Sequence, residues 1–116
     1  MFVLVDTSVW IDHLQRLNHD LISLLEQNLV LTHPAIIGEL ACGNLKKRME
    51  VLDYLKFLPP CQEASHEEVF EMVERRNLFG KGLNWIDVHL LASAILSNAH
   101  LWTKDKNLKR FSSAII

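Results

Sequence analysis

Four acidic residues stand at positions where a carboxylate can do chemistry. Two follow short apolar runs at residues 2–5 and 100–103, which are typical of strands buried inside a parallel sheet. The other two lie within apolar segments that are expected to be helices. In open α/β folds the ligand site lies beyond the carboxyl ends of the strands, so the strand-end acids occupy the expected place. The four residues are Asp6, Asp105, Glu39 and Asp87.

A cluster of these four carboxylates would be a metal site of a particular kind. Four like charges in one cleft are unfavourable unless cations neutralise them. Oxygen ligands without a nearby His or Cys favour Mg²⁺ or Mn²⁺ over zinc, and such a site suits phosphoryl chemistry. No Ser-His-Asp or Cys-His arrangement is evident, so covalent catalysis is not expected. We therefore take all four acids as candidate catalytic and metal-binding residues.

Three of the acids also have a simpler structural interpretation. Asp6, considered alone, is more readily explained as the cap of the following helix. Asp105 is placed to cap a short helix at residues 106–110, and Asp87 to form a capping box with Asn84. Glu39 has no such explanation, because it lies on an almost wholly apolar helix with no basic residue nearby, where burying it unpaired would be costly.

The helix that contains Asp87 is apolar enough to be a central, buried element. Leu90, Leu91 and Ala94 share the stripe of Asp87, so its carboxylate is expected to point inward. His89 lies about 200° around the helix from Asp87, so we expect it to make a polar contact elsewhere.

Strands and helices alternate along the chain, which predicts an α/β fold with a parallel sheet and helices on both sides. The last residues, within 112–116, are expected to form a final strand. Trp85 and Trp102 are interpreted as core residues rather than base-stacking platforms, and Phe70 as buried. The predicted strands are 2–5, 29–32 and 100–103, and the predicted helices are 9–17, 21–26, 35–45 opened by Pro34, 46–57, 66–78 capped by Ser65 with Glu68, 85–98 and 106–110.

Composition narrows the class of protein. The chain has 116 residues, typical of one domain, with 49% hydrophobic and 22% charged residues, which argues against disorder. No apolar run reaches the roughly 18 residues of a membrane span, and no signal peptide is expected. The two cysteines, Cys42 and Cys61, have no metal-ligand spacing, so reduced thiols and a cytoplasmic location are expected.

The net charge of −2 is unusual for a protein that binds nucleic acid. If four of the 14 acids neutralise bound cations, the remaining 10 face 12 Lys and Arg residues, a balance that permits binding to an anionic partner. A basic cluster surrounds Asp105, and it has two possible interpretations. It is either a solvated helix face or a set of phosphate contacts that position RNA without reading its sequence. The cluster comprises Lys104, Lys106, Lys109 and Arg110.

Four motifs, in order and at suitable separations, resemble the PIN domain, and within that family the VapC-type toxins of bacterial toxin–antitoxin pairs. The motifs are Val5-Asp6-Thr7-Ser8-Val9-Trp10-Ile11-Asp12, Ile37-Gly38-Glu39-Leu40, Trp85-Ile86-Asp87-Val88-His89-Leu90-Leu91-Ala92-Ser93-Ala94 and Leu101-Trp102-Thr103-Lys104-Asp105. The resemblance covers essentially the whole chain, so residues 1–116 are expected to be a single PIN domain.

This resemblance implies a three-layer α/β/α fold and an endoribonuclease that depends on Mg²⁺ or Mn²⁺. It also implies an RNA substrate, a homodimer and inhibition by a small cognate antitoxin protein. By position, the acidic metal site would be Asp6, Glu39, Asp87 and Asp105, with Asp6 and Asp87 as the most direct ligands. Thr7, Ser8 and Thr103 match the hydroxyls beside the acids, and Asp12 lies outside the set.

Two other functions remain open from the sequence. One is a PIN-like module that binds RNA or a partner protein without cleavage, although such a module gains nothing from holding four like charges together. The other is a phosphoacceptor signalling domain, which would have an acidic pair after its first strand and an acceptor Asp at the end of a middle strand. Here Asp6 stands alone after the first strand.

Overall fold

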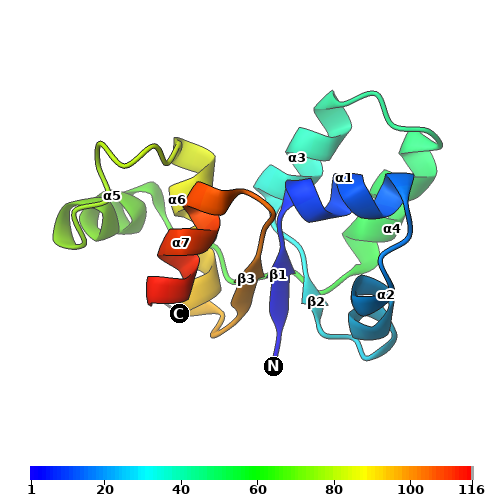
Figure 1. Cartoon of the computed structure of the whole chain (residues 1–116), viewed down its shortest axis with the longest axis horizontal. Coiled ribbons are helices and arrows are strands. Elements are labelled where there is room, and N and C mark those ends of the chain that lie inside the picture. Colours follow the sequence, from blue (N-terminus) through cyan, green and yellow to red (C-terminus); the bar gives the residue numbers. More distant parts are fainter. Residues whose placement is uncertain (116) are drawn as a thin grey trace.

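A three-stranded parallel sheet organises the fold, with β1 (Val3–Val5) at its centre. Figure 1 shows β2 (Val30–Leu31) on one side of β1 and β3 (His100–Trp102) on the other. Val3 is in register with Val30 on one side and with His100 on the other. The carboxyl ends of all three strands therefore meet at one edge of the sheet. The structure is a computed structural model, which describes the backbone of residues 1–115 and the side chains of residues 1–113.

Within residues 1–115, seven helices flank this sheet, and with it they give the predicted α/β architecture. Figure 1 shows α1 to α4 beside β2, and α5 to α7 beside β3. Among the described residues, no helix is long and apolar enough to cross a membrane. The helices are α1 (Thr7–Gln15), α2 (His19–Glu26), α3 (Pro34–Cys42), α4 (Arg48–Phe57), α5 (His66–Arg75), α6 (Trp85–Leu96) and α7 (Lys106–Ile115).

The core surrounds the sheet and receives buried side chains from the helices on both sides of it, with α6 contributing many of them. Leu4 and Val5 of the central strand are fully buried, as are Leu90, Leu91 and Ala94 of α6. The expectation that α6 is a central element is confirmed. Its first turn is the exception, because it projects beyond the carboxyl edge of the sheet (Figure 1).

The predicted final strand is wrong. Residues 106–115 form one continuous helix, α7, and residue 116 lies outside the described residues. Leu108 and Ser112 are buried and Phe111 packs against the core, so the buried positions recur at a helical spacing rather than a strand spacing. The buried positions thus have the spacing of a helix along the whole segment.

The prediction that Trp85 and Phe70 are core residues is also wrong. Trp85 is 41% exposed and Phe70 is 61% exposed. The two rings contact each other across the α5–α6 pair, with centroids 4.9 Å apart, and both remain exposed. Trp102, in contrast, is half-buried and packs against the core, as expected.

Candidate active site

Asp6 lies at the carboxyl end of β1 and is only 8% exposed. Its backbone N–H donates to the carbonyl of Trp102 at 2.9 Å, which continues the pairing with β3. The side chain makes no capping hydrogen bond to α1 although it occupies the N-cap position, so the capping interpretation is wrong. Instead, Oδ2 accepts hydrogen bonds from the hydroxyls of Ser8 at 2.8 Å and Thr103 at 2.7 Å. The carboxylate is thus held rigidly at the junction of β1, α1 and β3.

Glu39 lies on α3, across from the start of α1. Its Oε1 accepts a 2.8 Å hydrogen bond from the hydroxyl of Thr7, the residue next to Asp6. The expectation that Glu39 is a buried acid is wrong, because the side chain is exposed beside Gly38. The position of Glu39 at the carboxyl edge comes from this link to Thr7, not from burial in an apolar environment.

Asp87 sits in the first turn of α6 and forms the predicted capping box with Asn84. The N–H of Asn84 donates to Asp87 Oδ2 at 3.0 Å, and the N–H of Asp87 donates to Asn84 Oδ1 at 2.8 Å. Partial burial raises the pKa of Asp87, and the hydrogen bond from Asn84 opposes the rise. The nearby carboxylates of Asp105, Asp6 and Glu39 raise the pKa further. All four predicted acids therefore belong to one electrostatic group.

Asp105 caps α7, as its sequence position suggested. Its Oδ1 accepts from the backbone N–H groups of Asn107 at 2.9 Å and Leu108 at 3.1 Å. Its own N–H donates to the Thr103 hydroxyl at 3.0 Å, so the same hydroxyl links Asp105 to Asp6. Asp105 is exposed, which leaves it accessible to a ligand that approaches the edge.

The four carboxylates share one feature that bears on metal binding. Each has one oxygen fixed by the hydrogen bonds above, while the other accepts none from the residues that the structure describes. No three His, Cys, Asp or Glu side chains in this part of the chain are grouped closely enough to hold one ion by themselves. Mg²⁺ commonly takes one or two protein carboxylates and completes its shell with water and substrate phosphate, so the donor set fits Mg²⁺ or Mn²⁺.

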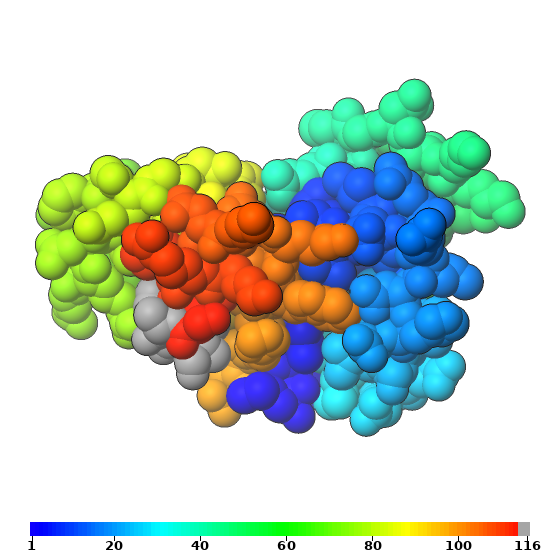
Figure 2. All heavy atoms as spheres, viewed as in Figure 1, coloured from blue at the N-terminus to red at the C-terminus, as the bar shows by residue number. Residues whose placement is uncertain are grey.

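The basic residues expected near Asp105 are exposed, but one of them is held in place. The backbone N–H of Lys104 donates to Ser8 Oγ at 3.0 Å, and its Nζ lies 3.1 Å from Asp12 Oδ1. Ser8 and Asp12 are one turn apart on α1, so Lys104 is attached to one face of that helix at two points. Figure 2 shows this contact between the orange segment after β3 and the blue α1. Asp12 therefore pairs with a cation and lies outside the acidic group, as expected. The other exposed basic side chains are Lys106, Lys109 and Arg110.

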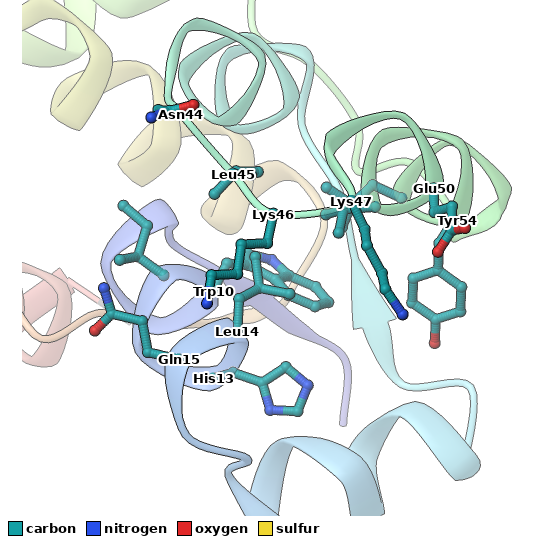
Figure 3. Close-up of a pocket in the computed structure, with 13 residues that line it drawn as sticks. Trp10, His13, Leu14, Gln15, Asn44, Leu45, Lys46, Lys47, Glu50 and Tyr54 are labelled. Atoms are coloured by element: carbon teal, nitrogen blue, oxygen red, sulfur yellow. The ribbon is translucent and has the colours of Figure 1, made fainter.

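A cavity of about 670 Å³ lies away from the acids, between α1 and α4 (Figure 3). Apolar side chains such as Leu14 and Leu45 line it, and Lys46, Lys47 and Glu50 add charges. Trp10 also lines it, and its buried Nε1–H has no hydrogen-bond partner among the described residues. This is therefore an apolar groove with an unused hydrogen-bond donor.

Another cavity, of about 430 Å³, lies between the starts of α3, α5 and α6. Its walls include His33, His66 and His89, which come from three separate segments of the chain. The sequence patterns did not predict this cavity. The only signal was that His89 should make a polar contact away from Asp87, which is confirmed by its 3.2 Å contact with His66.

Comparison with known proteins identifies relatives over almost the whole chain. Residues 3–113 match the family model described as the PIN domain. Two proteins named Ribonuclease VapC32, from Mycobacterium tuberculosis strains CDC 1551 / Oshkosh and ATCC 25618 / H37Rv, are each 46% identical over 108 residues. The match covers 92% of this chain and 87% of each relative. A search of solved structures gave no match.

Proposed function

Because this chain belongs to the PIN domain family, we propose that it is a VapC-type toxin, an endoribonuclease that hydrolyses RNA phosphodiester bonds with Mg²⁺ or Mn²⁺. One observation carries the proposal. Hydrogen bonds hold acids from distant segments beside one another, because Thr103 links Asp6 to Asp105 and Thr7, the neighbour of Asp6, holds Glu39. The rise in the pKa of Asp87, caused first by burial and then by these three carboxylates, agrees with this arrangement.

In this proposal the four acids are the metal-binding and catalytic residues, with Asp6 and Asp87 as the most direct ligands. Each would use the oxygen that accepts no intramolecular hydrogen bond. A bound Mg²⁺ or Mn²⁺ would supply a water of lowered pKa and positive charge for the phosphate. Thr103 and Ser8 would hold the Asp6 carboxylate in one orientation, because both hydroxyls donate to its Oδ2.

The remaining site residues position the other acids and the RNA. Thr7 orients Glu39, and Asn84 orients Asp87 through the capping box. Lys104, Lys106, Lys109 and Arg110 would contact backbone phosphates next to Asp105 and add affinity without reading the sequence.

Cleavage of RNA by the purified chain tests this function. Single-stranded RNA should be cut in Mg²⁺ or Mn²⁺ and left intact in excess EDTA. Asp6→Asn and Asp87→Asn should each reduce the rate by several orders of magnitude while the protein stays folded. Asp53→Asn is a matched control, because Asp53 is an exposed acid on α4. Cleavage that persists in the two site variants would contradict the site assignment. RNA binding without any cleavage would favour the non-cleaving module.

We further propose that a small antitoxin regulates this enzyme, that the chain forms a homodimer, and that it acts in the cytoplasm. The groove between α1 and α4 is the best candidate binding site for a segment of the antitoxin. Its apolar wall would cover the non-polar face of a peptide, and the Trp10 Nε1–H would meet a peptide carbonyl. The free cysteines, exposed Cys42 and buried Cys61, agree with a reducing compartment.

A further inference from the structure

The cavity between the starts of α3, α5 and α6 is lined by a residue that has a buried hydrogen-bond donor with no acceptor among the described residues. His33 lines this cavity and is only 5% exposed. Its Nδ1 accepts a 3.0 Å hydrogen bond from the N–H of Ala35, so in the neutral ring the proton is on Nε2. That Nε2 has no partner among the described residues. A buried polar group without a partner is costly, and a ligand that brings an acceptor would remove the cost.

One wall of the same cavity is an exposed aromatic surface. The rings of His66 and Trp85 are stacked, with centroids 5.7 Å apart and an angle of 28° between their planes. The ring centroids of Phe70 and His89 lie 4.9 Å and 4.6 Å from that of Trp85, tilted by 44° and 80°. The indole is therefore fixed in orientation, yet 41% of the residue remains accessible. A fixed and accessible aromatic ring is well suited to stacking against a planar ligand.

The charges in the cavity favour an uncharged ligand over a phosphate. Burial lowers the pKa of His33, so its ring favours the neutral form. Glu63 also lines the cavity, close enough to raise the pKa of His33 in part. Its carboxylate would repel a phosphate, whereas it could accept a hydrogen bond from an amino group.

We propose that this cavity binds an unpaired nucleobase of the RNA substrate, which stacks on Trp85 and accepts a hydrogen bond from His33 Nε2–H. The proposal rests on the proposed function and adds a base-binding subsite to it. A volume of about 430 Å³ lies in the range of about 300–1,000 Å³ typical of small-molecule sites.

Two helices connect this subsite with the acidic group. Ala35 lines the cavity, and Glu39 lies one turn further along the same face of α3. Trp85 opens α6, and Asp87 follows two positions later, about 200° around the helix. A strand of RNA whose phosphate lies at the acids would therefore have to pass around the first turn of α6 to place a nearby base in the cavity.

Binding of short single-stranded RNAs in EDTA tests the subsite without cleavage. Trp85→Ala should weaken binding by about tenfold through lost stacking, whereas Trp85→Phe should keep most of the affinity. Phe79→Ala, an exposed aromatic that does not line the cavity, should bind as the wild type does. RNA should also quench the tryptophan emission of the wild type, and a ribose-phosphate oligomer without bases should not.

His33→Asn tests the hydrogen bond, because Asn can still cap α3 but lacks the Nε2 donor. Adenine, cytosine and uracil oligomers should bind the wild type with different affinities, and His33→Asn should reduce those differences. If His33→Asn fails to fold, the Trp85 series decides alone.

The outcomes separate the subsite from the nuclease proposal. Equal binding by Trp85→Ala, Phe79→Ala and the wild type would overturn the subsite, even if metal-dependent cleavage is intact. A change of oligomeric state in Trp85→Ala, measured by sedimentation, would also overturn it, because the aromatic surface would then be a subunit interface. Base-dependent quenching in a chain that never cleaves RNA would support the subsite and contradict the nuclease.

Discussion

Thr103 Oγ1 donates a hydrogen bond of 2.7 Å to Asp6 Oδ2, and this bond joins the ends of two neighbouring strands around a buried carboxylate. Hydrogen bonds to charged groups are stronger than neutral ones, and an unpaired buried charge is costly. The same hydroxyl accepts from the N–H of Asp105. One side chain thus sets the separation of two candidate metal ligands.

Removal of the Thr103 hydroxyl should therefore destabilise the protein more than the loss of a single small group suggests. Thr103→Val keeps the shape but removes the donor, and should lower the free energy of unfolding by about 2 kcal/mol, with Thr103→Ser close to the wild type. Thr7→Val is the matched control, because the Thr7 hydroxyl donates to an exposed carboxylate, that of Glu39. Urea unfolding measures both variants. Equal losses for Thr7→Val and Thr103→Val would contradict the role given to burial.

The raised pKa of Asp87 predicts how stability depends on pH. Burial and the neighbouring carboxylates raise it above the ordinary value of 3.8, so the folded state favours the protonated form. Relative to Asp87→Asn, the metal-free wild type should lose stability as pH rises from 3.8 through the folded pKa, and should stay lower above it. Melting temperatures in EDTA over a pH series measure this difference.

Addition of Mg²⁺ at neutral pH should restore the stability that the metal-free wild type loses, and should have no such effect on Asp87→Asn. A difference between the two proteins that does not change with pH would show that the carboxylates do not interact.

Lys104 should contribute to RNA affinity through charge alone. Lys104→Ala should weaken RNA binding at low salt and reduce the slope of log K against log salt by about 0.7, the value for one phosphate contact on a single strand. Lys56→Ala, an exposed lysine of α4, should leave the slope unchanged. The measurement is RNA affinity in EDTA at several salt concentrations, and identical slopes for the two variants would exclude a phosphate contact.

The groove between α1 and α4 predicts variants that escape the antitoxin. Leu14→Asp places a charge in the groove, and should abolish inhibition by a cognate antitoxin while RNA cleavage continues. Leu17→Asp is the control, because Leu17 is 65% exposed and does not line the groove. Cleavage assays with and without the antitoxin measure the effect. Full inhibition of Leu14→Asp would place the antitoxin elsewhere.

The two cysteines should differ in reactivity. Burial raises the pKa of Cys61 to about 11, so almost none of it is thiolate at neutral pH, whereas Cys42 is exposed. Iodoacetamide should label Cys42 first, and Cys61 only on unfolding. Mass spectrometry of the native protein checks this, with Cys42→Ser expected to take up no label until denaturant is added.

The sequence predicted the strand-end acids well, because the pattern of an apolar run followed by a carboxylate is local. It also predicted the capping boxes at Ser65 and Asn84, whose partners lie three residues away. Exposure was predicted less well. Glu39 and Trp85 lie on apolar helices but remain exposed, and periodicity within a helix does not reveal what packs against it.

The histidine cavity was missed for a related reason. His33, His66 and His89 come together only because α3, α5 and α6 begin near one another, and nothing in their sequence spacing indicates it. The end of the final helix was predicted as a strand because its last residues carry few polar side chains. The buried spacing of Leu108 and Ser112 is clear only once the sheet is in place.

The hydrogen bond between Thr103 and Asp6 also has a consequence for protein synthesis. Because β1 is made first and lies between its partners, its carboxylate waits for β3, which is translated nearly a whole chain later. A ribosome must therefore pass residue 105 before the four proposed site acids can come together. A fragment that ends before β3 should accordingly lack the assembled site and cleave no RNA.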